Sequence, residues 1–226
     1  HFRASLIGGR TGRWLLRGCS MAAMVLGMLT KESVVTVPVM IVLVDWLVMG
    51  SAFKTSVRRA IPLLICMGVA PALVLFTTWA QNDGRRTLGA AFNLANRDDA
   101  PRSHHDYFLT SLKVIMTYLR LLLVPINLNL DPKVEWSQSI SDWRVLLSIA
   151  GITGIMAGAW MVFRRWSGDV RASMVLVFAV WYFVTLAISS GLVPLPDAMA
   201  EHRAYVPIMG AIAVLVCLLD MIRTRF

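Results

Sequence analysis

Long, uninterrupted blocks of apolar residues dominate this sequence and limit the folds open to it. Six blocks reach or approach the about 17 to 25 residues that a helix needs to cross a bilayer. They are Trp14–Leu29, Val34–Met49, Ala60–Ala80, Trp143–Phe163, Ala172–Ile188 and Val206–Ile222. Because the apolar residues come in blocks and do not alternate, an outer-membrane β-barrel is excluded. We predict an all-α fold, a polytopic transmembrane helical bundle of about six spans, with residues 1–226 forming a single membrane domain.

The composition agrees with this fold class. Of the 226 residues, 57% are apolar and 15% are charged, and the mean hydropathy is +0.66. Soluble domains are less apolar and carry roughly 25% charged residues. These values exclude a disordered chain and an ordinary cytosolic enzyme.

Basic residues gather at four places and predict the orientation of the bundle. The clusters are Arg3/Arg10/Arg13/Arg17, Lys54/Arg58/Arg59, Arg164/Arg165/Arg171 and Arg223/Arg225. Because Lys and Arg are enriched in cytoplasmic loops, we place all four clusters in the cytoplasm, which assigns the whole net charge of +9 to that side. No basic face is left outside the lipid, so we expect no nucleic-acid partner.

This orientation places residues 81–142 on the outer side as one long loop. Within it, residues 108–124 are apolar but cannot be a simple span, because both ends face the same side. Thr110, Lys113, Thr117 and Arg120 fall on one face of a helix. We predict an interfacial or cavity-lining helix with this polar stripe toward water or a ligand. The alternative is a true span with the opposite topology downstream.

Three segments put charged side chains at the predicted outer edge of the membrane. The residues singled out are Lys31 and Glu32 in a turn, Tyr118 and Arg120 in the helix, and Glu201, His202, Arg203 and Tyr205 before the last span. Charges at this depth usually face a cavity or a ligand, and an Arg fork matches phosphate oxygens. The alternatives are a solvated turn at Lys31, snorkelling of Arg120 and a structural clamp between Glu201 and Arg203.

Two further patterns are less specific. The adjacent His104 and His105 diverge and lack partners at metal-ligand spacing, so no metal site is predicted. Gly151, Gly154 and Gly158 thin one face of the helix expected over Trp143–Phe163, and the Gly154–Gly158 pair has small-xxx-small spacing, which predicts close helix packing on that face.

The three charged segments, taken in order, resemble a known family. Residues 27–32 (GMLTKE), followed by Pro38 and Asp45-Trp46, are similar to its first motif. The second motif is matched by residues 118–122 (YLRLL) with 125–131, and the third by residues 194–197 (PLPD) with 201–207 (EHRAYVP) and Gly210. Order and spacing resemble the bacterial relatives of the TMTC-type protein O-mannosyltransferases. These are GT-C membrane glycosyltransferases, usually with C-terminal tetratricopeptide repeats.

The resemblance implies a GT-C-like fold and transfer of a sugar from a polyprenyl-phosphate donor to an acceptor hydroxyl. It implies a multi-pass protein of the bacterial inner membrane, acting on its outer face on a protein or glycan acceptor. By the same resemblance Lys31, Arg120 and Arg203 bind the lipid phosphate, where charge develops on the leaving group. The supporting residues are Glu32, Tyr118, Glu201, His202 and Tyr205. The partners are membrane lipid and the lipid-linked sugar donor, and no permanently bound cofactor is implied.

The resemblance also implies that this chain is a fragment. It begins at His1, in what corresponds to the loop before the fifth span of the family, and lacks the first spans and the first outer loop. That loop holds the general base in GT-C enzymes, so we expect the catalytic residue outside this chain and no activity from the chain alone. Two alternatives stay open: a non-catalytic lipid-binding membrane scaffold, or a transporter subunit with paired repeats and charges near the midplane.

Overall fold

The computed structural model describes residues 10–30, 32–68, 104–126, 134–188, 199 and 201–224. Every regular element within these ranges is helical, which confirms the predicted all-α fold class. The chain divides into two compact units. The first comprises His1–Trp46 and Gly50–Ala91, and the second comprises Leu47–Met49 and Phe92–Phe226.

The first unit is built from helices packed around a small core. Its elements are α1 (Arg10–Thr30), η2 (Glu32–Thr36), α2 (Val37–Leu43), which continues into the π-helical turn η3 (Val44–Val48), and α3 (Phe53–Met67). Pro38 lies in the first turn of α2, where its missing N–H costs no helical hydrogen bond. Met24 of α1 packs with Leu63 and Cys66 of α3, and this contact joins the two helices.

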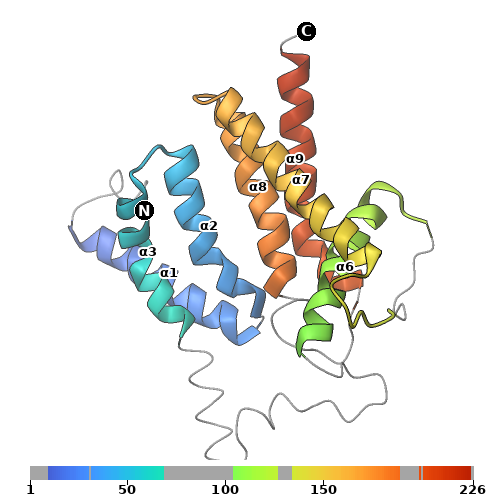
Figure 1. Ribbon diagram of the computed structural model, residues 1–226. Coiled ribbons are helices and arrows are strands. Elements are labelled where there is room, and N and C mark those ends of the chain that lie inside the picture. Colours follow the sequence, from blue (N-terminus) through green and yellow to red (C-terminus); the bar gives the residue numbers. More distant parts are fainter. Residues whose placement is uncertain are drawn as a thin grey trace, which may run out of the picture. The chain divides into compact units, whose positions relative to one another are not determined.

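The second unit is a bundle of helices. It contains α6 (His104–Leu123), α7 (Trp143–Arg165), α8 (Val170–Ala187), η5 (Glu201–Ala204) and α9 (Tyr205–Arg223). The helices α7 and α8 form an antiparallel hairpin whose turn includes Gly168, with a φ of +104° that favours glycine. Figure 1 shows α7, α8 and α9 side by side, with α6 packed near the start of α7.

Two hydrophobic clusters hold this second unit together, one toward each end of α8. At the end where α6 packs, here called the α6 end, the buried residues are Val114, Ile115, Tyr118, Tyr182, Leu186, Met199 and Ala204. At the other end, here called the hairpin end, they are Ala159, Ala172, Val175, Leu176, Ala179 and Met221. The Tyr182 hydroxyl also donates to the carbonyl of Ile115 at 3.1 Å, which satisfies a buried polar group at the α6 end.

Arg171 ties the first turn of α8 to the last turn of α9 at the hairpin end. Its guanidinium pairs with Asp169 at 3.0 Å and with Asp220 at 2.9 Å. It also donates to the Thr224 hydroxyl at 2.8 Å. The polar groups of the hairpin end are therefore used to join helices.

Gly210 lets α8 and α9 approach closely. A Cβ at this position would lie 2.7 Å from Cδ1 of Trp181 and 2.9 Å from the carbonyl oxygen of Phe178. A Cβ at Gly154 or Gly158 would meet nothing within 4 Å in the part of the chain that the structure describes. The expectation of close packing is thus met at Gly151, where an added Cβ would lie 2.7 Å from Cε of Met116 in α6, and is not met at Gly154 or Gly158 among the described residues.

Among the described residues, three helices are long and apolar enough to cross a membrane: α7, α8 and α9. They match the last three predicted spans. The apolar stretches Trp14–Thr30 and Ser33–Val48 coincide with the first two predicted spans but form shorter helices. The third predicted span, 60–80, is described only to residue 68, and the count of six spans stays a prediction.

Candidate functional site

The polar stripe of α6 faces a cavity at the α6 end of the second unit. Lys113, Thr117 and Arg120 line this cavity, which has a volume of about 700 Å³. Thr110, the fourth member of the stripe, is fully buried, and its Oγ1 accepts the backbone N–H of Ser137 at 3.0 Å. Three members of the stripe thus line a cavity, as the periodicity predicted, and the remaining member, Thr110, anchors a neighbouring segment.

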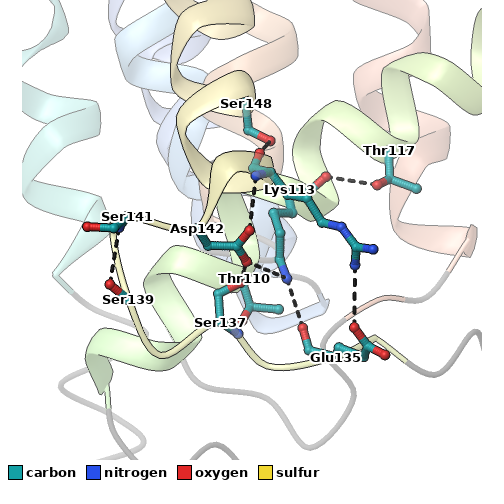
Figure 2. A network of polar contacts seen from close by, with 10 residues as sticks. Thr110, Lys113, Thr117, Glu135, Ser137, Ser139, Ser141, Asp142 and Ser148 are labelled. Carbon is teal, nitrogen blue, oxygen red and sulfur yellow. Dashed lines mark hydrogen bonds and ion pairs between the residues drawn. The ribbon is translucent and has the colours of Figure 1, made fainter.

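That segment, residues 134–142, is called the strap here, and it leads from beside α6 into α7. Figure 2 shows Lys113 pointing from α6 toward the strap, where its ammonium donates to the Glu135 carbonyl at 2.9 Å. The rings of Tyr107 and Trp136 lie 6.1 Å apart, which adds an aromatic contact between α6 and the strap. Backbone and side-chain contacts together hold the strap as one wall of the cavity.

Asp142 ends the strap and caps α7. Its carboxylate accepts the backbone N–H of Arg144 at 3.0 Å and the hydroxyl of Ser137 at 2.8 Å, and lies 3.9 Å from the ammonium of Lys113. The N–H of Arg144, the hydroxyl and the two nearby cations all favour the ionised form and hold the pKa of Asp142 below its usual 3.8. The Asp142 charge is therefore used to fix Lys113 and the start of α7.

Arg144 places a second guanidinium on the cavity. Its Nη1 donates to Oε2 of Glu135 at 3.3 Å, and both side chains are well exposed, at 55% for Arg144 and 88% for Glu135. The guanidinium of Arg120 is exposed as well and makes no hydrogen bond or ion pair with any residue that the structure describes. The cavity thus presents two accessible guanidinium groups and one restrained ammonium.

The rest of the described lining is mostly apolar. It comprises Val114, Met116, Val134, Trp143, Leu147, Met199 and the hydroxyl-bearing Ser148. Lys113, Arg120 and Arg144 are its cations, and Glu135 is its one carboxylate among the described residues. This combination suits an anion attached to an apolar group, because the cations neutralise the anion and the apolar surface covers the remainder.

The predicted phosphate ligands fall in different places. Arg120 lines the cavity. Arg203 is half-buried in η5 and is not among the described lining residues. Lys31 lies outside the described residues.

The two supporting residues whose side chains the structure describes, Tyr118 and Tyr205, do not line the cavity with Arg120. Tyr118 is 3% exposed and belongs to the core at the α6 end, because residues two apart on a helix point in different directions. Tyr205, at the start of α9, is 71% exposed. Glu32 begins η2, and Glu201 and His202 begin η5, but their side chains lie outside what the structure describes.

Sequence reasoning missed Glu135 and Arg144 as members of the site. The role of Asp142 as a helix N-cap could have been predicted, since an Asp directly before an apolar run is a typical helix N-cap. Lys113 was placed on the stripe but not assigned a partner. The Glu135–Arg144 pair depends on the path of the strap, and no local spacing predicts it.

Comparisons with protein-family models, with curated proteins and with solved structures gave no match to this chain. Within the described residues, no group of three or more His, Cys, Asp or Glu is arranged to hold a metal ion.

Proposed function

We propose that this chain is part of a membrane glycosyltransferase that transfers a sugar from a polyprenyl-phosphate donor to an acceptor hydroxyl. The cavity of the second unit carries the proposal, because it sets cations beside apolar side chains at the start of α7, a helix apolar and long enough to span a membrane. A lipid-linked phosphate needs this combination, since its headgroup is an anion and its tail is hydrocarbon.

The chemistry gives Arg120 a clear task. In the transfer, the acceptor oxygen attacks the sugar carbon and loses its proton to a base, and the bond from that carbon to the phosphate oxygen breaks. The bonding electrons remain on the phosphate, which gains negative charge. Arg120, exposed on the cavity, would stabilise that charge as it develops. Lys31 and Arg203 are proposed as further phosphate ligands from the motif resemblance.

The charges of the second unit support an outward-facing cavity. Arg164 and Arg165 end α7, Arg171 begins α8 and Arg223 ends α9, so all four lie at the hairpin end. The cavity lies at the other end of α7, a distance of roughly 35 Å along its 23 residues. Since the basic end is expected in the cytoplasm, the cavity belongs on the outer face.

The finer features of the proposal come from the resemblance. They are a six-span GT-C-like bundle, a location in the bacterial inner membrane, a protein or glycan acceptor, and C-terminal tetratricopeptide repeats in the full-length protein. The base that receives the acceptor proton is assigned to a part of the protein outside this chain.

A transfer assay tests the proposal. The full-length protein in detergent is incubated with a panel of polyprenyl-phosphate sugars and with hydroxyl-bearing peptides and glycans, and product is measured for the wild type, Arg120→Ala and Arg165→Ala. We expect Arg120→Ala to lower the rate by about 10²-fold or more, as loss of a charge-stabilising donor does. Arg165→Ala is the matched control, because it removes an exposed cation at the other end of α7. Equal rates for Arg120→Ala and the wild type would contradict the role of Arg120.

A lipid-binding scaffold is the second candidate, and one observation favours it. The single carboxylate of the described lining, Glu135, lies 3.3 Å from Arg144 and is thereby engaged. The described lining therefore has an anion site without a separate base. A wild-type protein that binds the polyprenyl-phosphate sugar but transfers nothing from any donor of the panel would favour the scaffold over the enzyme.

A further inference from the structure

Lys113 and Arg144 are held at the cavity in different ways. The Lys113 side chain is only 13% exposed, and its ammonium is fixed by the Glu135 carbonyl at 2.9 Å and by Asp142 at 3.9 Å. The Arg144 guanidinium pairs with the Glu135 carboxylate at 3.3 Å, and both side chains are exposed. The guanidinium also lies 5.6 Å from the centre of the Trp143 ring and close enough to Asp142 to favour the ionised form of that carboxyl group. Strong bonds from a cationic nitrogen to a carboxylate are about 2.7–2.9 Å long. The Lys113 ammonium is thus fixed in the cavity wall, whereas the Arg144 guanidinium is held by weaker interactions.

We infer that Arg144 is a second phosphate ligand of this cavity and that Glu135 is its internal competitor, which holds the guanidinium until an anion arrives. On binding, Arg144 exchanges the Glu135 carboxylate for phosphate oxygens, and Glu135 turns to water. No covalent bond changes. The inference rests on the proposed function for the nature of the anion and adds two residues to the same site.

The charges around the cavity make this exchange favourable. The described lining carries three cations and one carboxylate, and Asp142 beside Lys113 adds a second carboxylate, so one positive charge remains in excess before any ligand binds. A polyprenyl-phosphate sugar is a phosphodiester and brings one negative charge, and the polyprenyl phosphate that leaves is a monoester with about −1.5 to −2 at neutral pH. Exposed ion pairs such as Arg144–Glu135 contribute little to stability, while a guanidinium can grip phosphate through two parallel bonds. Replacing the carboxylate by phosphate therefore gains more than it loses.

The other polar groups near Arg144 are already used. The hydroxyl of Ser148 donates to the Arg144 carbonyl at 2.7 Å, and the hydroxyl of Thr117 donates to the Lys113 carbonyl at 2.8 Å. Both hydroxyl hydrogens therefore serve the helix backbone. Within the described lining, the guanidinium groups of Arg120 and Arg144 remain as the cationic donors that an incoming anion can recruit.

Binding measurements on the full-length protein in detergent test the exchange. Dissociation constants for farnesyl phosphate are measured by titration calorimetry for the wild type, Glu135→Gln, Arg144→Gln and the double variant. We expect Arg144→Gln to weaken binding about tenfold, the effect of losing one charge-assisted contact. Glu135→Gln should tighten binding by up to about fivefold, because the competing carboxylate is gone.

The double variant separates exchange from a general field effect. If Glu135 acts by holding Arg144, the double variant should bind farnesyl phosphate with the same dissociation constant as Arg144→Gln alone. If Glu135 only repels the phosphate through space, the gain persists in the double variant, and the inference is overturned. Arg144→Lys, which keeps the charge but loses the fork, should fall between the wild type and Arg144→Gln. Melting temperatures of all variants and the matched Arg165→Gln establish that each is folded.

Two more probes identify the source of the phosphate. Inorganic phosphate that shows the same pattern of variant effects as farnesyl phosphate supports a site for the headgroup alone, and a pattern seen only with farnesyl phosphate supports a lipid-linked ligand. Farnesol, which lacks the anion, should respond to none of these substitutions. Wild-type protein that binds neither phosphate overturns the inference. Sugar transfer that depends on Arg120, with binding indifferent to Glu135 and Arg144, would leave the proposed function standing and remove only the exchange.

Discussion

Asp142 joins three parts of the candidate site through one carboxylate: the strap, α6 and the start of α7. It receives the Arg144 N–H and the Ser137 hydroxyl, and it restrains Lys113. These interactions hold the pKa of Asp142 below 3.8, so the folded state favours the ionised form more than the unfolded state does. The stability that Asp142 contributes is therefore present above about pH 4 and is lost as the pH falls through the lowered pKa.

The stability that Asp142 contributes should therefore depend on pH in the acid range. We expect Asp142→Asn to melt at a lower temperature than the wild type at pH 7, since the amide loses the charge that restrains Lys113. The difference should shrink as the pH falls from about 4 through the lowered pKa of Asp142, because the carboxyl group is protonated first in the unfolded protein and then in the folded one. Melting curves in detergent from pH 3 to pH 7 measure it. A gap between the two proteins that stays constant down to pH 3 would rule out a contribution from the ionised carboxylate.

Some residues of the candidate site could be assigned from the sequence, and others could not. The four-residue stripe of α6 followed from helical spacing alone, and its three cavity-lining members lie where that spacing placed them. Tyr118 was assigned to the site because it is close in sequence to Arg120, yet the helix turns it into the core. Glu135 was missed because its position depends on how the strap folds over α6, which no periodic pattern encodes.

At the scale of elements, the packing of α8 on α9 depends on Gly210. Trp181, the nearest side chain, donates its Nε1–H to the Val206 carbonyl at 3.1 Å, so it cannot swing away without losing a hydrogen bond. The Phe178 carbonyl is part of the α8 backbone and is fixed in place. An added methyl group must therefore push the helices apart.

Substitution of alanine for glycine at two sites tests this packing. Gly210→Ala should lower the free energy of unfolding by about 1–3 kcal/mol, the usual cost of overpacking. Gly154→Ala is the matched control and should raise it by up to about 1 kcal/mol, because alanine is the better helix former and nothing described blocks the methyl group. Unfolding titrations in mixed detergent measure both. Equal effects at the two sites would mean that α8 and α9 are not in close contact at Gly210.

Small-residue spacing predicted helix contacts only in part, because Gly151 lies against Met116 of α6 while Gly154 and Gly158 meet no described residue. The Gly154 and Gly158 pair matched a general pattern for close packing, but a contact needs a second helix on that face. The useful glycine, Gly210, has no such partner spacing and was notable only as part of a motif. Helix position was more predictable, because a block of apolar residues specifies its own helix and its approximate ends.

At the scale of the whole molecule, composition and apolar blocks predicted the helical class and the three long apolar helices. The shorter helices of the first unit were harder to interpret. The polar residues Lys31 and Glu32 and the break around Gly50 limit their apolar lengths, so length alone does not assign them to spans. The orientation of the second unit depends on a different property, the distribution of Lys and Arg, and is independent of the helix count.

Cysteine labelling tests that orientation directly. In a variant with Cys19, Cys66 and Cys217 replaced by Ala, a single cysteine is introduced either by Ser139→Cys in the strap or by Ser167→Cys in the α7–α8 turn, both exposed positions. Because Arg164, Arg165 and Arg171 flank the turn, we expect it in the cytoplasm. A membrane-impermeant maleimide added to spheroplasts should then label Ser139→Cys and spare Ser167→Cys until the membrane is dissolved. The reverse pattern would place the cavity on the cytoplasmic face, where an outward-facing sugar transfer at Arg120 could not occur.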